Sequence, residues 1–234
     1  MPLLPFLTDD QFLPIVKSMV DAVEKKKIGL GNSLASNVLD PFNAAFQSAA
    51  HGLTRVNWES AERARQLQKT FEHQMGSLHQ SVLGALPDWE NLTTGNVTDL
   101  LNKKQKLCAE VKNKHNTVKA SDEASVYQKL LGLVGTSGAY RGYTAYYVTI
   151  VPKRKSAMNE PFAPSDNAAG VRKPSNDRIR KIDGYSFYAL ATGRAHALRE
   201  LFLALPVAVA EFTKTPANAE SLRDLFETAY GIRD

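Results

Sequence analysis

Cysteine is nearly absent from this sequence, and so are long apolar runs. The single cysteine, Cys108, excludes an internal disulfide, and no set of cysteines and histidines has the spacing of a zinc finger. Crossing a bilayer takes about 20 apolar residues in a helix, whereas the run at residues 3–7 is interrupted by Pro5 and followed by two aspartates. No basic flank precedes that run, so no signal peptide is expected. We therefore expect a cytoplasmic protein with no membrane partner.

The content of charged residues is moderate, and the excess of positive charge lies in one segment. The chain has 234 residues, 43% of them hydrophobic, which suffices for one large globular domain. The net charge is +5, and residues 153–181 hold eight basic residues against three acidic ones, a surplus equal to the whole excess. The eight are Lys153, Arg154, Lys155, Arg172, Lys173, Arg178, Arg180 and Lys181. Such a segment predicts an anionic partner such as nucleic acid, and a solvated basic loop is the alternative.

Hydrophobic periodicity predicts both helices and strands. The predicted helices cover residues 8–27, 41–51, 60–86, 121–134, 194–214 and 218–230, with Pro206 as a candidate break. The predicted strands cover residues 96–101, 106–112 and 144–151, and the first two form a hairpin. Residues 152–183 contain scattered Pro, Gly, Ser and Asn, which is typical of a long loop. The order predicts an α/β fold, a central mixed sheet flanked by helices, in a single domain 1–234 with a basic loop-rich segment 152–183.

The predicted hairpin carries the residues with the clearest chemistry. Side chains alternate along a strand, so Glu110 and Lys112 share one face with Cys108, and pairing can bring Asp99 beside Glu110. Neighbouring carboxylates are best tolerated around a cation, and oxygen ligands favour Mg²⁺ or Mn²⁺ over Zn²⁺. A lysine beside them can orient a water and stabilise a phosphate. The alternative is an exposed ion pair, which is common for Glu-x-Lys on a strand, so the residues alone indicate only a candidate metal-dependent nuclease.

The pattern Asp99, ten residues, then Glu110-Val111-Lys112 resembles the PD-(D/E)xK motif, with Thr98 in place of the usual proline. Longer segments resemble type II restriction endonucleases that cleave GGNCC; they cover residues 38–46, 68–84, 109–122, 140–153, 161–167 and 183–198. The resemblance implies a restriction-endonuclease-like fold and a homodimer that hydrolyses double-stranded DNA with Mg²⁺, or Mn²⁺ in its place, leaving 5′-phosphates. It implies no organic cofactor. Asp99, Glu110 and the Val111 carbonyl would hold the metal, and Lys112 would attend the attacking water.

Further candidates flank this motif. Gln68, Glu72, Gly76 and Gln80 form a polar stripe, and the resemblance implies a metal-site role for a glutamate of this helix, for which Glu72 is the candidate. An exposed polar stripe is the alternative. Residues after Lys112 that suit DNA contacts are Asn113, Lys114, Asn116 and Lys119, with a polar loop as the alternative.

The eight basic residues of 153–181 are candidates for DNA binding and for reading guanines, since arginine and lysine bind guanine in the major groove. Two other functions stay open: a repair or structure-specific nuclease of the same fold, and a non-catalytic DNA-binding protein. Intact Asp99, Glu110 and Lys112 argue against the second.

Overall fold

The computed structural model describes residues 2–34, 37–92, 98–118, 120–166, 170–216 and 220–231. The chain divides into two compact units, which we call unit 1 (Met1–Val16 with Gly76–Asp234) and unit 2 (Lys17–Met75). The expectation of one domain stays a prediction. Seven α-helices and one 3-10 helix are assigned within the described ranges: α1 Asp9–Asn32, α2 Pro41–His51, α3 Arg55–Gly84, α4 Ala120–Val134, α5 Gly184–Thr192, α6 Ala197–Thr213, η2 Glu220–Leu222 and α7 Arg223–Tyr230. Among these helices none is long and apolar enough to cross a membrane.

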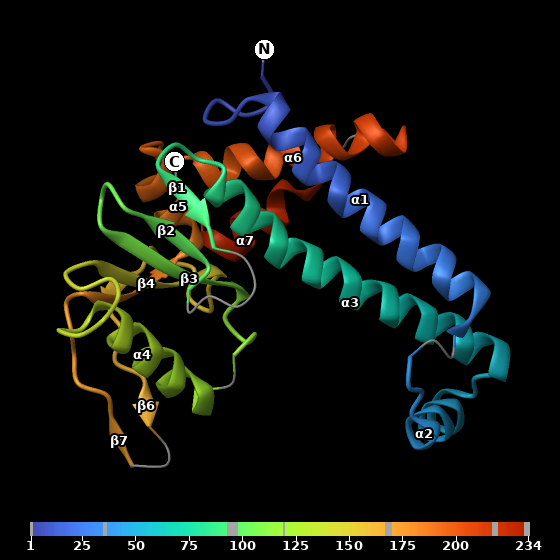
Figure 1. Ribbon diagram of the computed structural model, residues 1–234. Coiled ribbons are helices and arrows are strands. Elements are labelled where there is room, and N and C mark those ends of the chain that lie inside the picture. The colour runs from blue at the N-terminus through green and yellow to red at the C-terminus, as the bar shows by residue number, and fades with distance from the viewer. Residues whose placement is uncertain are drawn as a thin grey trace. The chain divides into compact units, whose positions relative to one another are not determined.

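Unit 1 is built on a mixed sheet (Figure 1). Six strands form it in the order β1 Trp89–Asn91, β2 Leu100–Asn102, β3 Leu107–Lys114, β4 Thr144–Val151, β8 Ile179–Asp183 and β5 Asn159–Pro161. The strands β1, β2 and β3 are antiparallel, β3, β4 and β8 are parallel, and β5 is antiparallel to β8. The predicted α/β fold with a central mixed sheet is thereby confirmed. Helix α4 makes the crossover between the parallel strands β3 and β4, as such a pair requires.

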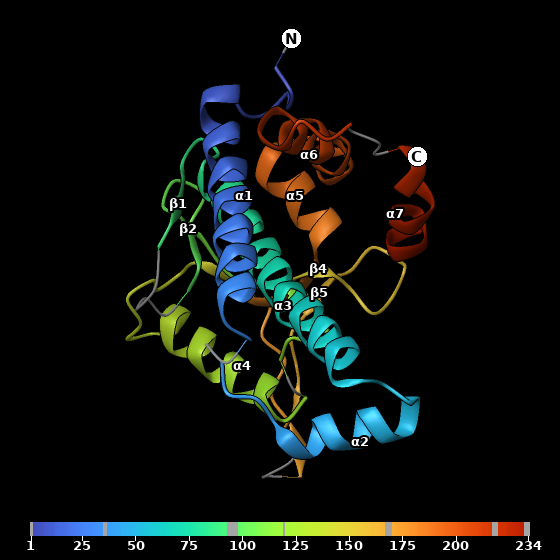
Figure 2. The ribbon, with the colours of Figure 1, turned by 90° about the vertical axis from the view of Figure 1, so that its right-hand side faces the viewer.

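Helices cover both faces of this sheet. Tyr127 and Leu130 of α4 pack in one cluster with Cys108 of β3 and Tyr147 of β4. On the opposite face Phe187 of α5 contacts the rings of Trp89 and Tyr146, and Figure 2 shows α4 and α5 on opposite sides of the strands. The face that carries Cys108 is therefore the α4 face, and strand alternation puts Glu110 and Lys112 on it as well.

Several predicted boundaries agree with the structure. The helix Pro41–His51 and the strand Thr144–Val151 have the predicted limits. Helix α1 begins after Thr8, whose N–H and hydroxyl both donate to Gln11 Oε1 at 3.1 Å. The candidate break at Pro206 is wrong, because α6 continues through it. Helix α5 and strand β1 were not predicted.

The expectation of a loop throughout residues 152–183 is also wrong. The segment contains β5, β8 and a two-stranded ribbon, β6 Ser165–Asp166 with β7 Val171–Arg172. Strand β8 lies between β4 and β5, with Ile179, Ile182 and Asp183 fully buried. The burial of β8 is not apparent from its sequence, because the strand contains Arg180 and Lys181. The aliphatic part of such a side chain can cover apolar surface while its charged end stays near water.

Unit 2 contains the C-terminal part of α1, α2 and the N-terminal part of α3. Asp40 caps α2 by accepting hydrogen bonds from the amides of Phe42 at 3.0 Å and Asn43 at 3.1 Å. Gly52 ends the helix at φ 63°, a left-handed conformation that favours glycine. The ends of α2 are thus set by local sequence, yet none of its residues is buried.

Candidate active site

Asp99 directly precedes β2 and is held there by hydrogen bonds to β3. Its amide donates to the carbonyl of Ala109 at 3.0 Å, and the Thr98 hydroxyl donates to the same carbonyl at 2.7 Å. The carboxylate Oδ2 accepts from the amide of Val111 at 2.7 Å. The predicted first strand of the hairpin differs in its limits. Asp99 lies in a bend before β2, while residues 96 and 97 lie outside the described part of the chain.

Glu110 and Lys112 meet on the α4 face of β3. The Lys112 Nζ donates to Glu110 Oε1 at 2.5 Å, and both side chains are about four-fifths buried (23% and 19% exposed). Burial and the charge of Glu110 raise the pKa of the Asp99 carboxyl. The structure therefore brings together Asp99, Glu110 and Lys112. The negative charge of Glu110 therefore disfavours the negative charge of Asp99.

The sequence stripe on α3 contributes a residue that was not chosen from it. The side chain of Gln80 hydrogen bonds to Asp99 and lowers the pKa of that carboxyl. Glu72, the predicted member, lies eight residues earlier on α3, in unit 2, and its role stays a prediction. Gln80 and Glu72 both belong to the polar stripe. A spacing of four residues predicts that they share a face of the helix, but it does not predict which turn of the helix lies beside Asp99.

Two polar rows cross the α4 face beside Glu110. Register pairs Glu110 with Tyr147 and Tyr147 with Lys181, and in the next row it pairs Lys112 with Thr149 and Thr149 with Asp183. The hydroxyls of Tyr147 and Thr149 are buried and have no hydrogen-bond partner among the described protein groups. Polar groups on a buried sheet face are costly unless they are partnered. The α4 face beside Glu110 therefore carries polar side chains. On the opposite face, the aromatic ring of Phe187 packs against the rings of Trp89 and Tyr146.

Three of the predicted DNA-binding residues are engaged within the protein. Lys181 Nζ pairs with Glu123 of α4 at 2.8 Å and lies 5.3 Å from the centre of the Tyr147 ring. Lys173 pairs with Asp166 at 2.8 Å, and the Arg180 guanidinium donates twice to Asn159 at 2.6 Å. Lys181, Lys173 and Arg180 therefore contribute to the folded structure of unit 1. The sequence did not predict these contacts, because the partner residues are distant in sequence or lie in short strands.

The other predicted DNA-binding residues differ in exposure. Those that the structure leaves exposed to solvent are Lys114, Asn116, Lys153, Arg154, Lys155, Arg172 and Arg178. Asn113 is half-buried at the end of β3, and Lys119 lies outside the described residues. The seven exposed residues are accessible to a large ligand from solvent.

Comparison with known proteins decides the family. The family model described as Eco47II restriction endonuclease matches residues 4–214. The type II restriction enzyme Eco47II of Escherichia coli is 40% identical over 210 residues, covering 89% of this chain and 87% of the relative. This chain belongs to the Eco47II restriction endonuclease family. The type II restriction enzyme Sau96I of Staphylococcus aureus is also similar, with 28% identity over 232 residues, 97% of this chain and 88% of the relative.

Membership in the Eco47II family confirms the predicted resemblance and the enzyme class. The protein is a type II restriction endonuclease, a site-specific deoxyribonuclease that binds DNA. The family favours this function over the two alternatives, a repair nuclease and a non-catalytic DNA-binding protein. Restriction enzymes of this type use divalent metal ions, so the donors in the site can be tested for fit.

The side chains of the Eco47II-family site fit a hard divalent cation. Asp99 and Glu110 provide carboxylate oxygens, the ligand type that such cations prefer, and their mutual repulsion falls when a cation lies between them. The hydrogen bond from the Val111 amide to Asp99 holds that segment of β3 backbone against the carboxylate. Among the described residues no group of three or more His, Cys, Asp or Glu side chains is arranged to hold a metal. Two carboxylates and a backbone carbonyl would be a different kind of ligand set.

Proposed function

We propose that this restriction endonuclease hydrolyses double-stranded DNA at GGNCC in a reaction that requires Mg²⁺, which Mn²⁺ can replace. Asp99, Glu110 and the Val111 carbonyl would hold the ion, and Lys112 would stand beside the attacking water. The observation that carries the proposal is the cluster of Asp99, Glu110 and Lys112, with Lys112 Nζ 2.5 Å from Glu110 Oε1. The GGNCC target rests on the resemblance of the longer sequence segments.

Bound Mg²⁺ would supply positive charge to a phosphate oxygen and lower the pKa of a bound water. The chain's own residues would do the rest. Turning Glu110 toward the ion removes its negative charge from the Lys112 ammonium, which is then available to hydrogen bond to the water or to the phosphate. The Gln80 amide would hold the Asp99 carboxylate in one orientation through the hydrogen bond between them. Hydrolysis would leave the phosphate on the 5′ end.

DNA contacts are proposed for the exposed basic residues of the segment 153–181. Lys153, Arg154, Lys155, Arg172 and Arg178 are exposed and would bind phosphates or guanine edges. Asn113, Lys114, Asn116 and Lys119 would contact the duplex next to Lys112. Lys173, Arg180 and Lys181 remain in the proposal as residues that shape the binding surface, because ion pairs and hydrogen bonds already engage them.

A homodimer is proposed because a palindrome presents the same bond on both strands, related by a two-fold axis. The test is digestion of a sequenced plasmid with Mg²⁺, followed by mapping of the ends. Cleavage at every GGNCC site with 5′-phosphates is expected. Cleavage at another site would overturn the target and leave the nuclease, whereas no cleavage with any divalent ion would overturn the proposal.

A further inference from the structure

Helix α2 in unit 2 presents two large aromatic side chains to solvent. Phe42 is 85% exposed and Phe46 is 73% exposed. The two residues are four positions apart, so they lie on one face of the helix; we call this the Phe42/Phe46 face. Val38, which precedes α2, is 97% exposed, and Val56, at the start of α3, is 75% exposed. Single exposed apolar residues are ordinary, but a paired aromatic face indicates a surface that another molecule covers.

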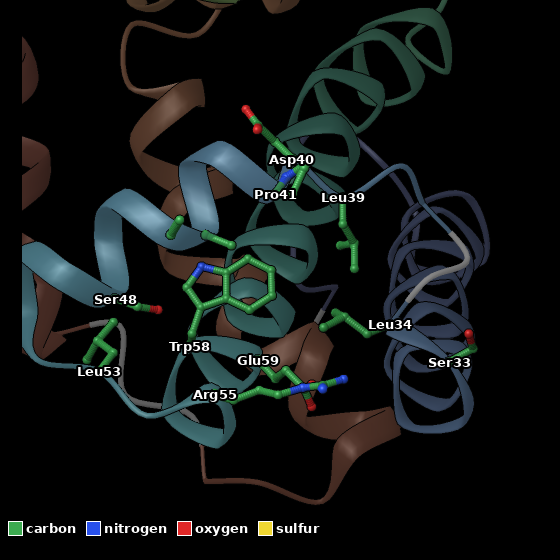
Figure 3. A pocket seen from close by; sticks show the side chains of 12 residues that line it. Ser33, Leu34, Leu39, Asp40, Pro41, Ser48, Leu53, Arg55, Trp58 and Glu59 are labelled. Carbon is green, nitrogen blue, oxygen red and sulfur yellow. The ribbon is translucent and has the colours of Figure 1, made fainter.

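The inner side of α2 borders an open cavity of about 640 Å³. Apolar residues from α2, from α3 and from the connections between the helices line it, among them Leu34, Leu39, Ala44, Leu53 and Trp58. In Figure 3 the Trp58 ring lies at the centre of this cavity, which we call the Trp58 cavity. An isolated helix of 11 residues is marginal in water. Because α2 fully buries none of its own residues, contacts with a second molecule would add to its stability.

We infer that the Phe42/Phe46 face and the Trp58 cavity form the surface through which two copies of this chain associate. The inference rests on the proposed function, because cleavage of a palindrome calls for two related active sites. A two-fold interface brings the same surface of each copy together, so that surface must be complementary to itself. Projecting rings and an apolar cavity on one helical unit supply both halves of such a surface.

The area agrees with a dimer interface. An aromatic side chain exposes roughly 200 Å² when free, so Phe42 and Phe46 together offer about 300 Å² on each chain. Two-fold symmetry doubles this to about 600 Å², more than a third of the roughly 1,600 Å² buried in a standard interface. Aromatic residues are also the usual energetic anchors of interfaces. DNA fits less well, because lysine and arginine supply most of the affinity for phosphates and the α2 sequence PFNAAFQSAAH contains neither.

The first test changes the mass of the protein in solution. The double variant Phe42→Glu with Phe46→Glu puts charge on the proposed interface and leaves the monomer core intact, because both rings are exposed. The matched control is Lys25→Glu, at an exposed residue of α1 that does not line the Trp58 cavity, which changes the net charge by the same two units. Light scattering and sedimentation should give dimers for the parent and the control and monomers for the double variant at micromolar concentration, with unchanged circular dichroism.

The second test measures protection of the surface itself. Cys108 is buried, so Phe46→Cys introduces one accessible thiol, and its labelling rate should fall as protein concentration rises. A labelling rate that is independent of protein concentration overturns the inference. A rate that falls on addition of DNA while light scattering shows one chain per duplex also overturns it, because DNA would then be the occupant. A double glutamate variant that stays dimeric and cuts GGNCC overturns the surface but not the proposed function. A parent dimer that the glutamates dissociate, but that cuts no DNA, overturns the function and not the surface.

Discussion

Asp183 connects β8 with α5 and with the segment that precedes β5. Its replacement by alanine should show how much these contacts contribute to the free energy of unfolding. Its side chain is fully buried at the end of β8, where it caps α5. Oδ2 accepts from the Met158 amide at 2.7 Å and from the Ser186 hydroxyl at 2.7 Å, and Oδ1 accepts from the Ser186 amide at 3.0 Å. Losing a helix cap costs about 1 kcal/mol, and an amide left without a partner costs about 1–3 kcal/mol. We expect Asp183→Ala to lower the free energy of unfolding by about 2–4 kcal/mol, which is roughly 10 °C in melting temperature.

Urea denaturation followed by circular dichroism in EDTA measures this loss without a contribution from bound metal. Asp183→Asn keeps one carbonyl oxygen for the cap and should lose about half as much. The control is Asp177→Ala, at an exposed aspartate of the same segment, which should change stability by less than about 0.5 kcal/mol. A loss below about 1 kcal/mol for Asp183→Ala would refute the reasoning, because a buried acceptor of three hydrogen bonds cannot be that dispensable.

Three further variants test other parts of unit 1. Gly184→Ala would put a Cβ 2.5 Å from the Ile150 carbonyl oxygen, so denaturation should show a loss of about 2 kcal/mol or more. Burial lowers the pKa of His79, bonded to Tyr188, to about 4. As pH falls, the unfolded chain therefore binds a proton at His79 before the folded chain does, and the free energy of unfolding should fall by about 1–3 kcal/mol between about pH 6.5 and pH 4. His79→Gln should make the free energy of unfolding less dependent on pH in this range. An unchanged pH dependence would show that His79 is not the group responsible. Gln80→Ala removes a hydrogen bond that lowers the pKa of Asp99, so calorimetric titration should show weaker Mn²⁺ binding and the pH profile of cleavage should move upward; no change in either would exclude Gln80 from the site.

The parts of the site that local geometry determines could be predicted from the sequence. Alternation along β3 fixes Glu110 and Lys112 on one face whatever surrounds them, and a short hairpin limits where Asp99 can lie. Gln80 could not be selected in the same way. It contacts Asp99 from a helix that is distant in sequence, and the choice between it and Glu72 depends on how α3 packs against the hairpin.

Strand β8 was missed for a different reason. A buried strand is usually recognised by apolar residues, but IRKID carries three charged ones. Lys181 is accommodated by Glu123, 58 residues away in sequence, and by the rings of Tyr147 and Phe162. Asp183 is accommodated by amides and a hydroxyl from two other segments. Long-range partners of this kind leave no periodic signal, so the same charges suggested an exposed DNA-binding loop.

Single-turnover cleavage by Lys112→Ala decides whether Asp99, Glu110 and Lys112 form the phosphodiesterase site. The measurement uses a GGNCC duplex with Mg²⁺ and compares the variant with the parent and with Lys104→Ala, whose lysine pairs with Asp88 at the surface. Duplex binding in Ca²⁺ verifies that the variant is folded and loaded. We expect the cleavage rate to fall about a thousandfold or more, which is about 4 kcal/mol of activation free energy, with duplex binding retained. A cleavage rate close to that of the parent, from a folded variant that binds the duplex, would exclude Lys112 from the reaction.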